Sequence, residues 1–474
     1  MAMGTRKARE RQQDLWIATD AIVKTPGNAF YDRLNKILDQ HQFDSKVEKL
    51  CRKFYKQSRY GRPSIAPGVY FRALLIGYFE GLDSERGIAW RTADSLSLRK
   101  FLGYGVDEQT PDHSTISRTR RLYWVETHTA VFRWVLGILS AEGLVAGATI
   151  AIDATTLEAN AAMKSIVRRE DGQSYNDYLK DLARAAGMED PTREQLARFD
   201  RKRKKKGSNE EWVSPADPDA RITKMKDGRT HLAHKAEHAV DLESGALLAV
   251  TLQPASAGDT TTIHQTLEAA QAAATEINER GGEEVVADKG YHSGEILKTL
   301  HGEGVRSYIP EPDRGRRKWE GKAIEQKRTY ENRRRVRGDR GQRLQKKRSE
   351  LTERSFAHLY ETGAMRRIHL RGRENILKRL VVHAAAFNLS LILRAMLGAG
   401  KPRQLQGLSL AVFSAYMRLL ASLETWLEEN ETQLFALRCK VTVDAVRKIP
   451  NQGSSEFDGF HYCPREISTT ATGC

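Results

Sequence analysis

The hydrophobic pattern of the chain changes its period near residue 148, and this change constrains the fold more than any other feature. Residues 28–140 place apolar side chains at helical spacing, as in "PGVYFRALLIGYFEGL" (67–82), where Pro67 opens a predicted helix. From residue 148 the sequence "ATIAIDATTLEA" alternates and is β-branched, which predicts a strand at Thr149–Asp153. The pattern therefore predicts an all-α N-terminal part followed by a part that contains a β-sheet.

The second part alternates strands and helices. After the first strand, a polar and helix-prone insertion fills residues 158–230. Two strands joined by a tight turn at Glu243-Ser244-Gly245 come next, then a helix at 260–282, the strand in "EEVVADKGYHS" (283–293), a helix, and a strand at 306–310. This order predicts a mixed α/β layer that opens with an antiparallel meander. A strongly basic, poorly periodic segment follows at 313–348, before helices resume at 350–363 and 374–398.

These patterns predict three domains. We expect a helical DNA-binding domain at 1–140, an α/β core at 145–398, and C-terminal helices with a loose tail at 399–474. In the N-terminal domain, Asp112 or Ser114 is placed as the N-cap of a helix that carries Arg118, Arg120 and Arg121. A helical bundle with a solvated basic face is the alternative interpretation of this segment.

Charge narrows the possible partners. Lys and Arg number 77 against 61 Asp and Glu, which leaves a formal net charge of +16 and favours a polyanionic partner. No apolar run approaches the ~20 residues of a membrane span, and the N-terminus does not resemble a signal peptide. The four cysteines have neither metal-ligand nor redox spacing. We therefore expect a reduced, cytosolic protein.

Two predicted strands end in aspartate: Asp153 follows "TIAI" and Asp288 follows "VVA". If these strands are neighbours, both carboxylates emerge at one edge of the sheet and repel each other unless a divalent cation lies between them. Oxygen ligands favour Mg²⁺ or Mn²⁺. Glu353, on a helix with an apolar face, would complete a two-metal site for phosphoryl transfer. Asp241 and Asp259 are alternative acids, although an Asp after a strand is often only a turn former.

Residues 55–395 resemble the DDE transposases of bacterial insertion sequences, which have an RNase H-like catalytic core. "YGRPSIAPGVYFRALLIGYFEGLDSERGIAWR" and "TPDHSTISRTRRLY" are similar to the helical domain that precedes such cores. "IAIDATTLEANAA" resembles the strand of the first Asp, and "VVADKGYHS" resembles the motif of the second. "ERSFAHLYETGAMRRIHLRGRENILKRLVVHAAAFNL" resembles the helix that bears the Glu and the sequence after it.

The resemblance implies a catalytic triad of Asp153, Asp288 and Glu353, which would bind two Mg²⁺ or Mn²⁺ ions. The chain departs from some relatives near the Glu: Ser349 stands where they carry Arg, with Arg348 one position away, and Tyr360 stands where they carry Lys. Glu350 and Glu361 are therefore rivals of Glu353.

The resemblance also implies cleavage at terminal inverted repeats and joining of the 3′-OH ends to target DNA, by at least a homodimer on double-stranded DNA in the cytoplasm, at the nucleoid. A metal-dependent nuclease of the same fold, or a catalytically decayed DNA-binding protein, is the alternative. The cations that we expect to contact DNA are Arg118, Arg120, Arg121, Lys204, Lys205, Lys206, Lys289, Arg333, Arg334, Arg335, Arg354, Arg366 and Arg367.

Overall fold

A computed structural model describes residues 28–55, 64–203, 207–225, 227–313, 315 and 317–404. Its contacts divide the chain into two units, Met1–Gln406 and Gly407–Cys474, and all described residues belong to the first. The predicted C-terminal helices and tail beyond residue 404 lie outside the described residues, as do Lys204, Lys205 and Lys206.

The N-terminal part is helical, as predicted. Nearly every residue of α3 is buried, because the other helices surround it. The Asp112 carboxylate caps α6 by accepting a hydrogen bond from the Thr115 amide at 2.6 Å, which confirms the predicted N-cap. The helices are α1 (Ala29–Gln40), α2 (Phe43–Cys51), α3 (Pro67–Phe79), α4 (Glu85–Asp94), α5 (Leu96–Leu102), α6 (His113–Leu122) and α7 (Val125–Ala141).

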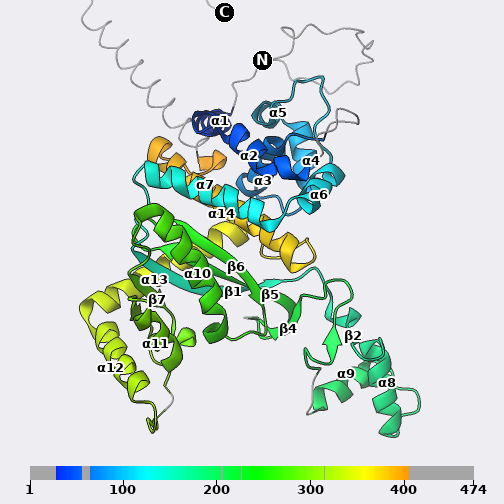
Figure 1. Ribbon diagram of the computed structural model, residues 1–474. Helices are drawn as coiled ribbons and strands as arrows, with labels where there is room; N and C mark the ends of the chain where they lie inside the picture. The colour runs from blue at the N-terminus through cyan, green and yellow to red at the C-terminus, as the bar shows by residue number, and fades with distance from the viewer. Residues whose placement is uncertain are drawn as a thin grey trace, which may run out of the picture. The chain divides into compact units, whose positions relative to one another are not determined.

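The second part is built on a mixed sheet (Figure 1). The strand order is β4-β5-β1-β7-β8, with β6 also paired to β5. β1 is antiparallel to β5 and parallel to β7, and β7 is parallel to β8. An antiparallel meander followed by two parallel strands is the RNase H-like arrangement, so the predicted fold class is confirmed. The strands are β1 (Thr149–Glu158), β4 (Arg221–Lys224), β5 (Thr230–Asp241), β6 (Leu247–Pro254), β7 (Glu284–Ala287) and β8 (Arg306–Tyr308).

The insertion after β1 forms a small lobe with its own apolar clusters. Trp212 is buried beside Ile166, and Tyr175 and Tyr178 pack against Trp212. A two-stranded sheet and two helices make up the lobe: β2 (Val167–Arg168), β3 (Trp212–Val213), α8 (Tyr175–Ala185) and α9 (Arg193–Lys202).

The basic segment 313–348, expected to be poorly periodic, contains α12 and the first half of α13. Arg, Lys and Gln favour helices intrinsically, and few residues of this pair of helices are buried, so few apolar residues are needed to hold it. The remaining elements are α10 (Asp259–Asn278), α11 (Gly294–Gly302), α12 (Ala323–Arg337), α13 (Asp339–Phe356), a π-helix (Ala357–Thr362) and α14 (Arg373–Leu397).

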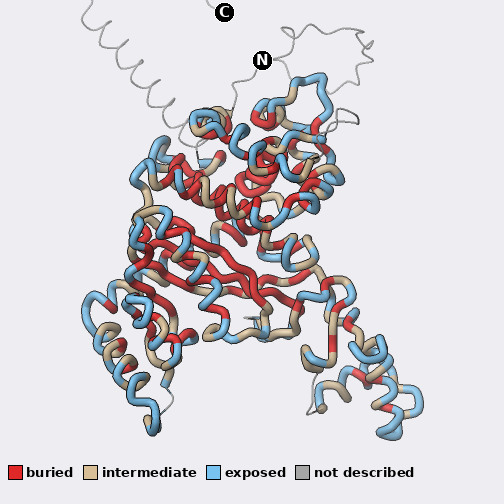
Figure 2. The backbone as a smooth tube through the Cα atoms, viewed as in Figure 1, coloured by how far each residue is buried: buried red, intermediate tan, exposed pale blue. Residues whose placement is uncertain are grey.

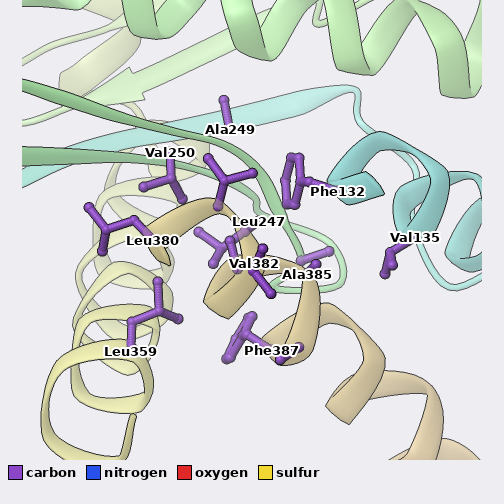
Figure 3. Packing of buried hydrophobic residues seen from close by; sticks show 14 of the residues in the cluster. Phe132, Val135, Leu247, Ala249, Val250, Leu359, Leu380, Val382, Ala385 and Phe387 are labelled. Atoms are coloured by element: carbon purple, nitrogen blue, oxygen red, sulfur yellow. The ribbon is translucent and has the colours of Figure 1, made fainter. Parts of the chain in front are cut away.

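The helical part and the sheet share one hydrophobic core, which is the continuous buried region in Figure 2. Its centre is α14, which packs against α3, α7 and β6. In Figure 3, Val382, Ala385 and Phe387 of α14 lie beside Leu247 of β6 and Phe132 of α7. The helix Arg373–Met396 is long and apolar enough to cross a membrane, but 89% of its apolar window is buried inside the protein. That burial is typical of a core helix.

Candidate active site

The sheet places Asp153 beside Asp288. In the parallel β1–β7 pair Ile152 lies opposite Ala287, so the next residue along each chain is an aspartate. The adjacency predicted from the two strands is thereby confirmed. Asp288 leaves the strand as the cap of a 3₁₀ turn, Lys289–Tyr291, and its Oδ1 accepts a hydrogen bond from the Gly290 amide at 2.7 Å.

Asp153 is held within β1 by contacts on both carboxylate oxygens. Its Oδ1 accepts from the Ala154 amide at 2.8 Å. Its Oδ2 lies 2.8 Å from Nη1 of Arg348 and accepts from the Thr352 hydroxyl at 3.2 Å. The Asp153 side chain is 23% exposed, so solvent can still reach it.

Burial raises the pKa of Asp153, and the negative charge of Asp288 raises it further, although Arg348 and the hydrogen bonds oppose both effects. The protein therefore holds two carboxylates together at an electrostatic cost. Carboxylate oxygens are the ligands that Mg²⁺ and Mn²⁺ prefer, and a divalent cation would relieve the repulsion. The donor set fits such an ion.

α13 lies across the ends of the central strands, as the prediction for the third acid requires. Gln345, Arg348 and Thr352 recur at helical spacing and face the sheet: the amide of Gln345 donates to the carbonyls of Ala287 and Tyr308 at 3.2 and 2.7 Å. Glu353 is the next residue after Thr352 and is exposed. Within the described ranges, no three His, Cys, Asp or Glu side chains are grouped as metal ligands. Glu353 stays a prediction.

The rival acids occupy different places. Glu350 is exposed on α13, and Glu361 is ion-paired with Arg366. Asp241 is buried in the turn between β5 and β6, where it accepts from the Ser244 amide at 3.0 Å and hydroxyl at 2.6 Å. This is the turn-forming role. Asp259, the first residue of α10, lies close to Gly290 in the Asp288 turn.

The predicted DNA-contacting cations divide into exposed and internally paired groups. Arg120 is 7% exposed, forms an ion pair with Glu85 and donates to Asn375, so it is left out of the surface proposed below. Arg333 is ion-paired with Glu311 at 2.6 Å, and Arg335 donates to the Ser307 carbonyl at 3.0 Å. The exposed cations are Arg118, Arg121, Lys289, Arg334, Arg354, Arg366 and Arg367, of which Arg366 also forms the ion pair with Glu361.

Two features of the site were missed by sequence reasoning. The sequence marks Arg348 only as displaced from a family position, yet it contacts Asp153; its spacing of four residues from Thr352 was the available signal. Lys235 and Glu237 had no predicted role. Their signal was the placement of two opposite charges two positions apart, and so on one face of the strand.

The fold and the pair of neighbouring aspartates, Asp153 within β1 and Asp288 directly after β7, define an RNase H-like core. Residues 148–389 match the family described as Transposase DDE domain, and residues 19–122 match the one described as Transposase domain (DUF772). Since the DDE match spans about half of the chain, the protein belongs to the DDE transposases of the insertion-sequence type.

Solved structures add little to this assignment. A Mos1 transposase paired-end complex with the left transposon end is 12% identical, with 65% of this chain and 82% of that chain covered and a TM-score of 0.18. A pre-cleavage Mos1 transpososome is 11% identical, with 72% and 99% covered and a TM-score of 0.19. Similarities this low carry no argument. No curated protein matches the chain.

Proposed function

We propose that this transposase cuts DNA at the terminal inverted repeats of an insertion sequence and joins the freed 3′-OH ends to target DNA. The observation that carries the proposal is the β1–β7 register, which brings Asp153 and Asp288 side by side in a DDE-family core. Both steps are in-line phosphoryl transfers, which need positioning and charge neutralisation rather than a covalent protein nucleophile.

Asp153 and Asp288 would hold the divalent metal, Mg²⁺ or Mn²⁺, and Glu353 is the proposed third ligand for a pair of ions. When bound, such ions activate the attacking oxygen and stabilise the leaving oxygen. Arg348 is placed to neutralise charge beside Asp153, because its guanidinium is only 12% exposed and is directed at the carboxylate. Lys289, exposed next to Asp288, is placed to contact a phosphate.

Backbone phosphates of double-stranded DNA are the proposed partners of the exposed cations. Arg118 and Arg121 are exposed on α6, which supports a role of the helical domain at the inverted repeats. Arg334 is exposed on α12 and Arg354 on α13. α13 contacts the two strands that position the aspartates, and α12 packs against α13. By analogy with concerted cutting of two DNA ends, we propose that the protein acts as at least a homodimer, in the cytoplasm at the nucleoid.

The test uses a labelled DNA that carries the end of the element, a target plasmid, and either Mg²⁺ or EDTA. We expect cleavage and joining that depend on the metal. Cleavage without joining would favour a nuclease of the same fold. DNA binding without either reaction, in Mg²⁺ and in Mn²⁺, would favour a decayed DNA-binding protein.

A further inference from the structure

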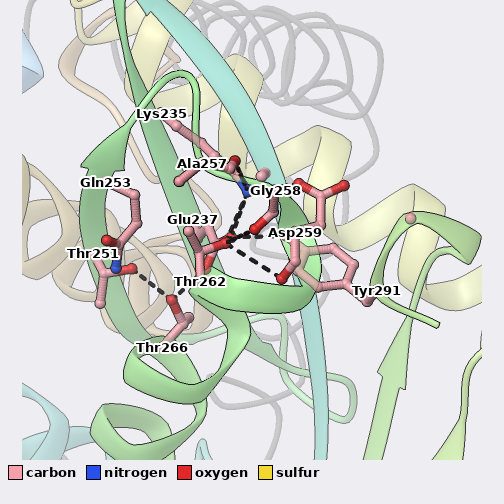
Figure 4. A network of polar contacts seen from close by, with 12 residues as sticks. Lys235, Glu237, Thr251, Gln253, Ala257, Gly258, Asp259, Thr262, Thr266 and Tyr291 are labelled. Carbon is pink, nitrogen blue, oxygen red and sulfur yellow. Dashed lines mark hydrogen bonds and ion pairs between the residues drawn. The ribbon is translucent and has the colours of Figure 1, made fainter. Parts of the chain in front are cut away.

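A polar network lies between β5 and α10 (Figure 4), on the face of the sheet opposite the one that the Asp153 side chain occupies. Asp153 pairs with His238 of β5, and successive strand residues point to opposite faces. Lys235 and Glu237 of β5 therefore face α10. Their exposures are only 5% and 0%, so this network is inside the protein.

Among the residues that the structure describes, Lys235 is the cation that bonds within this network, and two carboxylates share it. Its ammonium lies 2.6 Å from Oδ1 of Asp259 and 3.1 Å from Oε1 of Glu237, and it donates to the Thr262 hydroxyl at 2.8 Å. Glu237 also accepts from the Thr262 hydroxyl and, at 2.5 Å, from the Thr266 hydroxyl. Lys235 and Glu237 are thus each held by several partners, and the Asp259 carboxylate is held by Lys235.

The network contacts the turn that carries Asp288 at two points. The buried Tyr291 hydroxyl donates to Oε1 of Glu237 at 3.2 Å. A Cβ atom built on Gly290 would collide with Oδ2 of Asp259 and lie 3.0 Å from Oδ1 of Asp288. The Asp259 carboxylate therefore packs against Gly290 from the side on which Asp288 lies.

Stability alone does not account for this arrangement. A buried ion pair contributes little net stability, because the cost of desolvating the charges offsets their attraction. A positioning role does account for the arrangement, because residues that contact a metal ligand commonly fix the orientation of that ligand and the affinity of the site for the ion. Two of the four residues in the Asp288–Tyr291 turn are held by a network fixed to β5 and α10.

We propose that Lys235, Glu237 and Asp259 are positioning residues that fix the Asp288 turn, and through it the orientation of the Asp288 carboxylate toward a divalent cation. This inference rests on the proposed function. Asp259, with 37% of its side chain exposed and Lys235 fixing one oxygen, presents the other oxygen to Gly290. Like charges so close together require the cation of Lys235 beside them.

The sharpest test is Tyr291→Phe, because it removes one hydroxyl and keeps the buried ring. The matched control is Tyr308→Phe: that hydroxyl also donates to a buried glutamate, Glu284, at 3.2 Å, but away from the Asp288 turn. Mn²⁺ affinity is measured by calorimetry on the free protein, together with the Mn²⁺ concentration that half-saturates cleavage. We expect Tyr291→Phe to weaken both roughly 10-fold and Tyr308→Phe to leave both unchanged.

Lys235→Met extends the test to the charge itself. We expect an equal or larger loss of Mn²⁺ affinity, with unchanged DNA binding in EDTA. If Lys235→Met does not fold, Tyr291→Phe still decides. Wild-type Mn²⁺ affinity in Tyr291→Phe, or equal losses in the two tyrosine variants, would overturn the positioning role and leave the proposed function intact. A wild-type protein that binds no Mn²⁺ and cuts no DNA would overturn the proposed function itself.

Discussion

At the scale of single residues, Asp153 combines the cost of burial with the proximity of Asp288. Its pKa is raised in the folded protein, so the ionised carboxylate destabilises the fold at pH values above that pKa. The metal-free folded protein therefore becomes more stable as the pH falls from the pKa of Asp153 in the folded state to its lower pKa in the unfolded state. It becomes less stable as the pH rises over the same range.

Asp153→Asn removes this cost and should raise the melting temperature in EDTA at pH 7.5 by roughly 1 °C, the shift that about 1 kcal/mol produces in a chain of this length. The gain should disappear at a pH below the unfolded pKa, because the wild-type side chain is then neutral too. Calorimetric melting at both pH values checks this. A lower melting temperature for the variant at pH 7.5 would mean that the ion pair with Arg348 outweighs burial.

Asp153 and Asp288 could be predicted from sequence, because each follows an apolar run whose end must reach either solvent or a partner. The roles of Lys235 and Arg348 could not. A lysine in a strand is usually exposed, and only the packing of α10 on β5 brings Asp259 to Lys235. Arg348 meets Asp153 because α13 crosses β1, a contact between residues far apart in the chain.

At the scale of elements, the orientation of α13 determines whether Glu350 or Glu353 lies nearer to Asp153. Thr352 contacts Asp153, and Glu353 follows it on the helix. We expect Glu353→Gln to reduce the cleavage rate by at least ~100-fold, since a neutral amide would replace the carboxylate that we propose as the third metal ligand. Glu350→Gln is the matched control and should stay within about 2-fold by the same reasoning. The opposite ranking in a single-turnover cleavage assay would transfer the role to Glu350.

The outer side of α13 should contribute to DNA affinity through bonds to phosphates. Lys346 and Lys347 are both exposed and directly precede Arg348. Replacing both with Gln should lower the slope of log Kobs against log salt concentration by up to about 0.9 for each phosphate that is no longer neutralised. The control is the same double change at Lys180 and Arg184 of α8, which are ion-paired with Asp177 and Asp181. Equal slopes for the two doubles would remove α13 from the interface.

The elements themselves were largely predictable where hydrophobic period was clear. The strand predicted at 149–153 continues to Glu158, because β5 pairs with β1 as far as that residue. The local sequence pattern does not indicate this pairing. Helix α12 and the first half of α13 were missed because a helical pair with few buried residues contains few apolar positions. Their helical state depends on propensity and on packing against α11, β1 and β8.

At the scale of the whole molecule, α14 joins the helical part to the sheet. Asn388, which is buried, donates to the Leu247 carbonyl and accepts from the Leu247 amide, both at 2.9 Å. These bonds satisfy the first residue of β6. They are made inside a core that includes residues from both parts of the chain.

Asn388→Ala should reduce the free energy of unfolding by about 2–4 kcal/mol, because it leaves two buried backbone groups without partners. Urea denaturation followed by helical and sheet signals should show one shared transition shifted to lower urea. The control is Ser390→Ala on the same helix, whose hydroxyl bonds to the Phe387 carbonyl and leaves β6 untouched. A loss no greater than that of Ser390→Ala would contradict this role.

The central claim is that the aspartates joined by the β1–β7 register form a metal-dependent site for DNA cleavage. Single-turnover cleavage of a labelled element end, with Mg²⁺ or EDTA, tests it most directly when wild type is compared with Asp288→Asn. We predict Mg²⁺-dependent cleavage by wild type, a loss of at least ~1,000-fold in the variant, and nearly unchanged DNA binding in both. Undiminished cleavage by Asp288→Asn would contradict the claim.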